Sequence, residues 1–448
     1  MAAGSSKKTY TTEKKAPVIN TSETGRNSNI GIIGKYLPAL INFWIFIPVI
    51  IYFAVINKYT VNIPFNDDYD AILGFLTKFK NATGVDKIGL LFSQHGDHRI
   101  FHSRIVYVVY YFIFGKINFV HIIFLANVQL VVIFVILIHF IKKAIPKYWN
   151  IVSLVTGFCL FDLSSFENAD FAMCGMQNYG VIMLFFISLY FYSLPGKKNI
   201  FLGGLFEAIC IFSSGNGVIC AACLTAFLIL NRGKVGSLVS GAILLACGAL
   251  YYFHYTKSTA VGSVSEIFTS ARDTRFFFHM IGSHFSYENG IEAGVCMFIL
   301  LIALIPVNMK FVFKQGTLPF ICILGVLLGT IVTISVFRSG AGEIASYWSR
   351  YIIYAHIIAS ILFIFLWIKL DGKKLFWYLM ASAAIVLLFA YKSNFDYGDT
   401  NLALMKKRLE YTPYYYFANG HSNEEIEKAK AIEAAACKEG IYCIQDER

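Results

Sequence analysis

Three carboxylates lie close together in the segment Pro64-Phe65-Asn66-Asp67-Asp68-Tyr69-Asp70, shortly after the first strongly apolar stretch of the chain. Adjacent acids repel each other and are costly to desolvate at a membrane boundary, so a purely structural role is hard to justify. Either the segment is an ordinary solvated loop, or one carboxylate acts as a general base on a hydroxyl while another orients it or holds a cation. The second interpretation is favoured.

A second polar cluster, Gln94-His95-Gly96-Asp97-His98-Arg99, precedes another apolar stretch. Two histidines and an aspartate could bind a metal ion, but zinc sites need three or four ligands, and no further ligands follow at regular spacing. Hydrogen bonding to a substrate, or contact of His98 and Arg99 with a phosphate, is the favoured interpretation.

Two arginines lie beside late apolar stretches. Arg338 opens the glycine-rich segment 338–343, and Arg350 lies in Ser349-Arg350-Tyr351. An arginine at a membrane interface can simply extend its head group to water. A lipid phosphate at this depth, however, needs a guanidinium, which binds phosphate oxygens in pairs and keeps its charge. Both interpretations stay open from the sequence.

The segment Glu167-Asn168-Ala169-Asp170 could face the same cavity as the acidic motif, and it could equally cap a helix. Candidates of lower rank lie in the segment 255–290: Arg272, Arg275, His279 and His284.

The composition places these groups in a membrane protein. Of 448 residues, 57% are hydrophobic and only 15% are charged, a balance that a soluble domain could not cover with polar surface. The net charge of +11 does not indicate nucleic acid, because Lys and Arg fall in short clusters between apolar segments, as in cytoplasmic loops. The ten cysteines offer no metal-ligand spacing.

Apolar stretches of helical length predict an all-α polytopic fold with about eleven transmembrane helices. The first is expected at 37–56, and the stretch 100–114 could either span the membrane or lie along its interface. We prefer the interface, because this stretch is short and because every later basic cluster then falls on the cytoplasmic side. The other spans are expected at 119–141, 149–164, 177–194, 200–213, 217–231, 235–254, 291–309, 318–337, 351–368 and 375–391.

This register places the N-terminus inside and the C-terminus outside. It predicts a disordered cytoplasmic tail at 1–35, a membrane domain at 36–391 whose first outer loop (59–117) carries interfacial helices, and a small periplasmic domain at 392–448. In that last part, Ser422-Asn423-Glu424-Glu425 is a capping box that predicts a helix to Cys437. We expect Cys437 and Cys443 to form a structural disulfide, since the outer compartment permits one.

The layout resembles the GT-C class of polytopic glycosyltransferases, which use lipid-phosphate sugar donors. In that class an outer loop after the first helix opens with an acidic pair, and interfacial helices precede the second span; Asp67-Asp68-Tyr69 and the segment 104–118 match these features. Glu167-Asn168, Gly215-Asn216-Gly217 and Ser349-Arg350-Tyr351 are similar to patterns of bacterial members that use polyprenyl-phosphate sugars. The chain most resembles the serotype-converting glucosyltransferases that decorate the O-antigen of lipopolysaccharide.

The resemblance implies an inverting transfer of one sugar, with glucose as the suggested one, from a polyprenyl-phosphate donor to a lipid-linked glycan. The active site would face the periplasm from the bacterial inner membrane. Asp67 would take the proton of the acceptor hydroxyl with Asp68 in support, and Arg350, with Arg338 and Arg99, would hold the leaving phosphate. Further substrate contacts are expected from Tyr69, His95, Asp97, His98, Glu167 and Asp170.

The participation of a divalent cation is left open. Two other functions are alternatives: a transporter or flippase of a lipid-linked saccharide, and an O-antigen polymerase or ligase. A transporter is expected to carry polar or broken helices at the bilayer midplane, whereas the polar clusters here lie at the outer edge. A polymerase or ligase needs no acidic pair after the first helix.

Overall fold

A computed structural model describes residues 42–231, 234–256, 271–285, 289–304, 316–338, 346, 348–371, 373, 375–411, 414 and 423–444. The chain forms two compact units, Met1–Trp44 and Ile45–Arg448. The predicted cytoplasmic tail at 1–35 lies outside the described residues.

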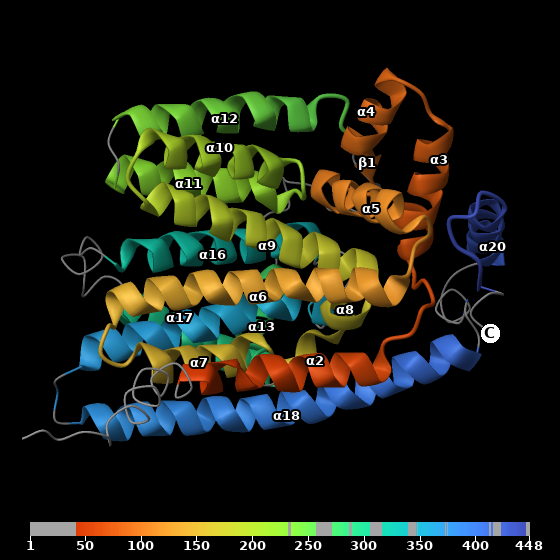
Figure 1. Cartoon of the computed structure of the whole chain (residues 1–448). Coiled ribbons are helices and arrows are strands. Elements are labelled where there is room, and N and C mark those ends of the chain that lie inside the picture. Colours follow the sequence, from red (N-terminus) through yellow and green to blue (C-terminus); the bar gives the residue numbers. More distant parts are fainter. Residues whose placement is uncertain are drawn as a thin grey trace, which may run out of the picture. The chain divides into compact units, whose positions relative to one another are not determined.

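The second unit is a bundle of long helices (Figure 1). Backbone polar groups in lipid must find partners within their own segment, so long apolar stretches fold as helices. The helices of the bundle are α2 (Ile47–Tyr59), α6 (Phe119–Ala144), α7 (Trp149–Leu160), α9 (Ala172–Ser193), α10 (Lys197–Ile211), α11 (Asn216–Asn231), α12 (Lys234–Tyr252), α13 (Ala271–Gly282), α14 (Gly290–Leu304), α16 (Leu318–Arg338), α17 (Ile352–Leu370) and α18 (Phe376–Tyr411).

Seven helices within the described residues are long and apolar enough to cross a membrane, and the chain is therefore an all-α membrane protein. They comprise Phe119–Ala144, Trp149–Asp170, Ala172–Ser193, Lys234–Tyr252, Leu318–Arg338, Ser349–Leu370 and Phe376–Tyr411. Each of the predicted spans overlaps one of the helices of the bundle. The number of about eleven spans and the orientation stay predictions.

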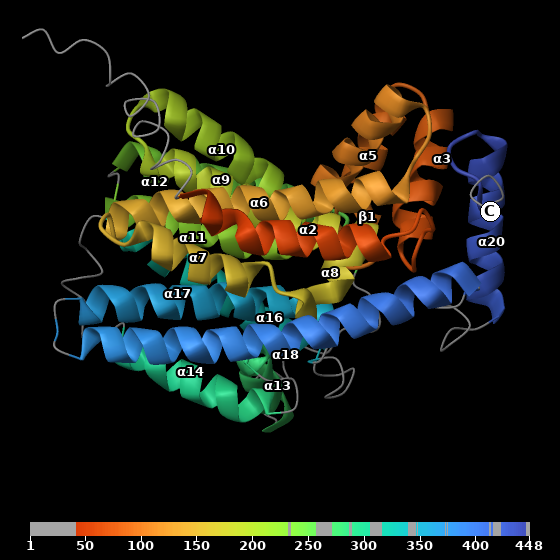
Figure 2. The same ribbon diagram turned by 60° about the horizontal axis from the view of Figure 1, so that its bottom comes forward.

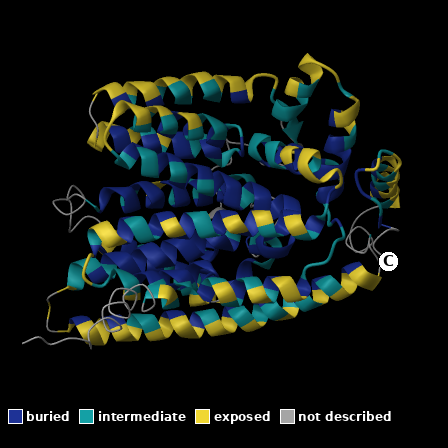
Figure 3. Ribbon diagram, viewed as in Figure 1, coloured by how far each residue is buried: buried dark blue, intermediate teal, exposed yellow. Residues whose placement is uncertain are grey.

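Helices α9 and α17 lie inside the bundle, whereas α12 and α18 lie on its outside (Figure 3). The most apolar windows of α9 and α17 are each 83% buried, against 22% for α12 and for α18. The outer helices expose apolar side chains, as expected where a helix faces lipid rather than water.

Short elements gather at one end of the bundle, on the right of Figure 1. We call this the site end. Its elements are α3 (Phe75–Asn81), α4 (Val85–Phe92), the hairpin of β1 (Gln94–His95) and β2 (His98–Arg99), α5 (Phe101–Phe114), η3 (Leu163–Ser165), α8 (Phe166–Asp170), η8 (Ser349–Tyr351) and α20 (Asn423–Lys438).

The connections from α6 to α7, from α9 to α10 and from α17 to α18 lie at the opposite end (Figure 1). There the Tyr148 ring packs 5.5 Å from both Trp367 and Trp377, so two of these connections touch. The described basic residues at or beside helix termini of this end are Lys142, Lys143, Lys147, Lys197, Lys198, Lys234, Lys369 and Lys373. The other members of the predicted cytoplasmic clusters, Arg232, Lys310, Lys314 and Lys374, lie outside the described residues.

Helix α5 is 14 residues long, about 21 Å, and is too short to span a bilayer core of about 30 Å. It ends at Gly115, whose φ of 75° is left-handed and suits glycine. Figure 2 shows α5 inclined to α6. Phe112, Ile113 and Phe114 near its end are more than half exposed. These features agree with the predicted interfacial helix.

Helix α18 continues well past the predicted end of the last span at residue 391. The charged pairs Lys392–Asp396 and Lys406–Glu410, each one helical turn apart, favour the helix beyond the apolar part. Near its far end, Lys406 Nζ donates to the carbonyl of Lys58 at 3.1 Å. The boundary predicted at 391/392 therefore lies inside one continuous helix.

The C-terminal segment packs on the first loop. Residue Ser422 of the predicted capping box lies outside the described residues, but α20 runs as predicted and Cys437 is bonded to Cys443, which confirms the disulfide. The bonded turn presents Tyr442, whose hydroxyl donates to the carbonyl of Asn62 at 2.7 Å and whose ring lies 5.1 Å from that of Phe119.

Replacing Cys437 and Cys443 together by serine should destabilise this segment by about 2 kcal/mol, because the unfolded chain gains freedom when a short loop is opened. Hydrogen–deuterium exchange of α20 in the purified protein measures the change. Cys296→Ser, at an exposed free cysteine, is the control and should leave α20 unchanged. Equal exchange in the double variant and the wild type would contradict the expectation.

Candidate functional site

The acidic motif forms a tight turn that is fixed by Asp68. The backbone of Asn66 has a φ of 49°, a left-handed conformation that asparagine tolerates. Asp68 Oδ2 accepts a hydrogen bond from the Phe65 amide at 3.0 Å, and Oδ1 accepts one from the Met173 amide at 2.8 Å. Burial raises the pKa of Asp68 to about 8, although these two amide donors act in the opposite direction. Asp68 therefore fastens the turn to the start of α9.

The neighbours of Asp68 differ in their surroundings. Asp67 is partly exposed, and Asp70 pairs with Lys428 of α20, so the two carboxylates face different partners. Tyr69 opens the π-helix η2 (Tyr69–Gly74), is 2% exposed, and packs its ring 5.8 Å from that of Tyr414. Tyr69, which was predicted to contact the substrate, thus packs against Tyr414 in the structure. Asp70 forms an ion pair with Lys428.

Arg99 holds the β1–β2 hairpin against the end of α12. Its guanidinium donates to the carbonyls of Tyr251 at 2.8 Å and Phe253 at 2.7 Å, and also to that of Phe92. Arg99 is not among the residues that line the cavity described next. Its guanidinium therefore has structural partners in place of the predicted phosphate.

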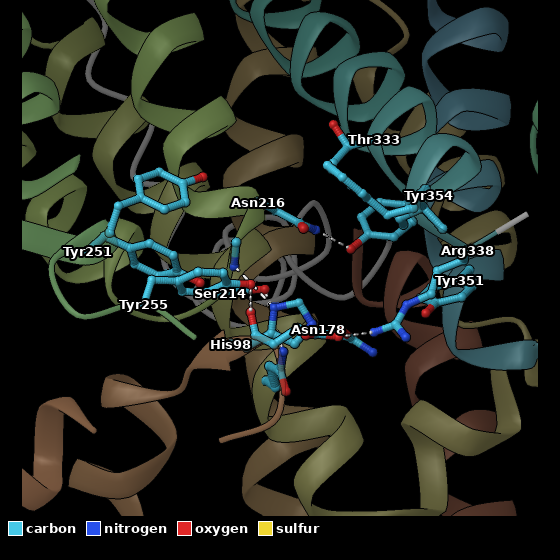
Figure 4. A pocket seen from close by; sticks show the side chains of 16 residues that line it. His98, Asn178, Ser214, Asn216, Tyr251, Tyr255, Thr333, Arg338, Tyr351 and Tyr354 are labelled. Carbon is cyan, nitrogen blue, oxygen red and sulfur yellow. Dashed lines mark hydrogen bonds and ion pairs between the residues drawn. The ribbon is translucent and has the colours of Figure 1, made fainter. Parts of the chain in front are cut away.

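A cavity of about 310 Å³ opens at the site end among α9, α11, α12, α16 and α17 (Figure 4). Six aromatic side chains line it: Tyr251, Tyr252, Tyr255, Phe337, Tyr351 and Tyr354. Polar groups share its wall, and Asn216 Nδ2 donates to the Tyr354 hydroxyl at 2.8 Å. A concave, mostly aromatic site with a few placed polar groups is typical of binding sites for small organic ligands.

One wall of the cavity carries an arginine and a histidine from distant segments. Arg338, at the end of α16, pairs with Asp97 of the hairpin turn at 3.2 Å. His98 Nδ1 accepts a hydrogen bond from the Gly215 amide at 3.5 Å. Burial and the charge of Arg338 lower the pKa of His98 to about 4, so its imidazole is neutral at pH 7. The rest of the glycine-rich segment, 339–343, lies outside the described residues.

Arg350 adjoins the cavity-lining Tyr351 and is held by Glu167 of α8. Glu167 Oε2 accepts from the Ser349 hydroxyl at 3.0 Å and from the Arg350 amide at 3.1 Å, and Oε1 lies 3.5 Å from Arg350 Nη2. The guanidinium also lies over the Trp348 ring at 5.0 Å. Several contacts therefore fix the direction of this cation.

The two acids of α8 have different roles. Asp170 is buried, and its Oδ1 accepts a hydrogen bond from the Thr60 hydroxyl at 2.6 Å. This contact joins α8 to the end of α2. Glu167 therefore lies beside the cavity through its contacts with Ser349 and Arg350. Asp170 instead has a structural contact that joins two helices.

Asp67 and Arg350 both lie near the first turn of α9. Cys174, in that turn, interacts electrostatically with both of them. Asp67 also interacts electrostatically with His95, which lies opposite His98 in the hairpin. The structure therefore brings the acidic turn, the hairpin and Arg350 into one region, although Asp67 does not itself line the cavity.

No family model matches the chain, and neither a curated protein nor a solved structure matches it.

Sequence reasoning missed most of the cavity wall. The aromatic run Tyr251-Tyr252 with Tyr255 was a signal, because aromatic residues at the end of an apolar helix mark a membrane interface or a ligand wall. Asn178 gave no signal, since its neighbours come from other helices. Of the lower-ranked candidates, Arg275, His279 and His284 do not line the cavity, and the side chain of Arg272 lies outside the described residues.

Asp68→Asn should destabilise the protein by about 1–3 kcal/mol, because one amide donor of Phe65 or Met173 would face an NH₂ group in place of a carboxylate oxygen. Thermal unfolding of the purified protein measures this loss. The same substitution at the partly exposed Asp70, Asp70→Asn, is the matched control and should change the unfolding temperature little. Equal unfolding temperatures for the two variants would contradict the structural role of Asp68.

His98 should make stability depend on pH. Its folded pKa of about 4 lies below the value of about 6.5 expected in the unfolded chain, so the unfolded state binds more protons between these values. The contribution of His98 is complete above pH 6.5 and is lost as the pH falls toward 4. Unfolding temperatures recorded across this range should fall less steeply for His98→Gln than for the wild type or for a variant at the exposed His254, His254→Gln.

Proposed function

We propose that this chain is a membrane-bound, inverting glycosyltransferase of the GT-C type, which moves one hexose from a polyprenyl-phosphate donor to a cell-surface glycan such as O-antigen. Glucose is the proposed sugar. The proposed location is the bacterial inner membrane, with the cavity toward the periplasm and the acceptor glycan lipid-linked.

One observation carries the proposal: an aromatic cavity at the end of a membrane bundle has one arginine on its wall, a second beside it and a partly exposed carboxylate in the same region. Arg338 lines the cavity, Arg350 adjoins it beside Tyr351, and Asp67 lies near the first turn of α9. Helix α9 also borders the cavity through Gln177 and Asn178 further along the helix. A sugar donor on a lipid phosphate needs these three features together. The lipid must enter from the bilayer, the phosphate needs cations, and the acceptor hydroxyl needs a base.

Asp67 is the proposed base, because Asp68 is already occupied. The Asp68 carboxylate accepts two backbone amides and is 1% exposed, whereas Asp67 is partly exposed on the same turn. In the proposed step Asp67 takes the proton of the acceptor hydroxyl, and the oxygen attacks the anomeric carbon. The bond from that carbon to the phosphate oxygen then breaks, and the polyprenyl phosphate leaves with the electron pair.

Arg350 and Arg338 are the proposed partners of the leaving phosphate. The ion pairs Arg350–Glu167 at 3.5 Å and Arg338–Asp97 at 3.2 Å hold both guanidiniums in place before substrate binds. Positioned charge of this kind stabilises the phosphate as it leaves without a cost of rearrangement in the transition state. The neutral His98 and the tyrosines of the wall would bind the hydroxyls and the ring faces of the sugar.

Transfer assays with single variants test the proposal. Purified protein is mixed with a panel of polyprenyl-phosphate hexoses and a lipid-linked glycan, and the gain of one hexose is measured by mass spectrometry. Asp67→Asn should lower the transfer rate by about a hundredfold or more. Arg350→Lys should also lower it, because a lysine cannot bind phosphate with a planar fork of donors.

Asp70→Asn is the matched control, since it removes a carboxylate of the same motif that pairs with Lys428. It should retain transfer. Full transfer by Asp67→Asn would show that the proposed base is wrong, and transfer by none of the hexose donors would remove the proposed reaction.

A further inference from the structure

A second polar group lies buried between α7, α13, α17 and α18, and none of its members lines the cavity. It consists of Asp162, which follows α7, His284, which follows α13, and His356 of α17, all fully buried. One ligand atom from each residue lies within 4.8 Å of the others, and in the described part of the chain this is the one such group of three or more metal-ligating side chains.

The buried carboxylate has no cationic side chain to balance it among the described Lys and Arg residues. Asp162 accepts hydrogen bonds from the Ser164 amide at 2.9 Å, the Ser164 hydroxyl at 2.7 Å and Asn394 Nδ2 at 2.8 Å, and its charged neighbours are the two imidazoles. A carboxylate removed from water costs several kcal/mol unless a positive charge compensates it. Such a carboxyl group is neutralised in one of three ways: it takes up a proton itself, a neighbouring imidazole is protonated, or a cation is bound.

Two imidazole nitrogens point at one another beside this carboxylate. His284 Nδ1 and His356 Nδ1 lie 2.8 Å apart, and Asp162 Oδ2 lies 3.9 Å from His284 Nδ1. A tetrahedral zinc ion with bonds of about 2.0–2.2 Å holds its ligand atoms about 3.3 Å apart. The His284–His356 separation is shorter than this value and the Asp162–His284 separation is longer. The other nitrogen of His356, Nε2, lies 3.6 Å from Asp162 Oδ1, so the side chains must rotate for one ion to bind all three residues.

We propose that Asp162, His284 and His356 bind a divalent transition-metal ion of the zinc type, with a water molecule as the fourth ligand. Two imidazoles and one carboxylate are the donor set that such ions prefer, whereas magnesium and calcium prefer oxygen ligands alone.

Residues around the three proposed ligands hold them in position through hydrogen bonds and close packing. Asn394 of α18 donates to the Asp162 carboxylate and, at 2.8 Å, to the carbonyl of His284. The position of His284 is set by α13, whose Gly282 lies so close to Gly290 that a Cβ there would meet the Gly290 carbonyl at 1.9 Å. Hydrogen bonds that orient metal ligands commonly tune affinity by tenfold to a hundredfold.

The proposed ion is structural rather than catalytic, because its ligands are fully buried. It would join the site ends of α7, α13 and α17. Asp162 is followed by Ser164 and Ser165, and the Ser165 hydroxyl donates to the carbonyl of Ser349 at 3.2 Å, next to Arg350. The proposal does not rest on the glycosyltransferase function, since metal content can be measured without substrate.

Metal analysis of the full chain tests the proposal. The protein carries a streptavidin-type tag, since a histidine tag would bind metal, and is purified in detergent, treated with a chelator, loaded with Zn²⁺ and freed of excess ion. Mass spectrometry of the metal should find about one ion per wild-type chain, and loading should raise the unfolding temperature. Asp162→Asn and His356→Gln should each lose at least about ninety per cent of the bound zinc.

His139→Gln is the matched control, because His139 lies in α6, outside this group, with its ring 4.9 Å from that of Tyr190. It should bind zinc as the wild type does. If a cluster variant does not fold, Co²⁺ loading of the wild type decides the question, since a tetrahedral site gives strong visible absorption. A wild type that binds neither Zn²⁺ nor Co²⁺, or no more than His356→Gln, would overturn the proposal and leave a hydrogen-bonded Asp-His-His network.

Discussion

The carboxylate of Asp68 joins two parts of the chain that are more than a hundred residues apart in sequence. It accepts the amide of Phe65 on its own turn and that of Met173 at the start of α9. Without a side chain in this place, two backbone donors would be buried with no partner, at a cost of about 1–3 kcal/mol each. The same contact sets the position of Asp67, and through α9 it relates the acidic turn to the cavity. The arrangement of the site end thus depends on one buried acid.

Both arginines of the site, Arg338 and Arg350, are held in place by an ion pair, but their other surroundings differ. Arg338 comes from the end of a membrane helix and pairs with a hairpin turn. Arg350 lies in a short 3₁₀ turn, pairs with Glu167 and lies over the face of the Trp348 ring. A long cationic side chain loses rotamer freedom when it binds an anion. Ion pairs formed in advance take on part of that entropy cost when the protein folds, so less remains at the moment of binding.

The sequence predicts the helices well and the site in part. A long apolar stretch in lipid must pair its own backbone polar groups and therefore folds as a helix, so the predicted spans overlap the observed helices. The sequence could also propose Asp67 and Arg350, because charge beside an apolar segment is rare. It could not show that Arg99 binds three carbonyls, since those belong to α4 and to the end of α12. Nor could it join Asp162, His284 and His356, whose separation along the chain exceeds seventy residues at every step and obeys no periodicity.

The packing of the C-terminal turn has a consequence for biogenesis. Ile441 and Tyr442 contact Ile117, Asn62 and Phe119, which belong to the first third of the chain. These partners leave the ribosome and enter the membrane hundreds of residues before the segment that covers them is translated. The first loop can therefore reach its final packing only after the segment 441–442 has been synthesised. Until then the amide of Ile117 and the ring of Phe119 lack the partners that the C-terminal turn supplies.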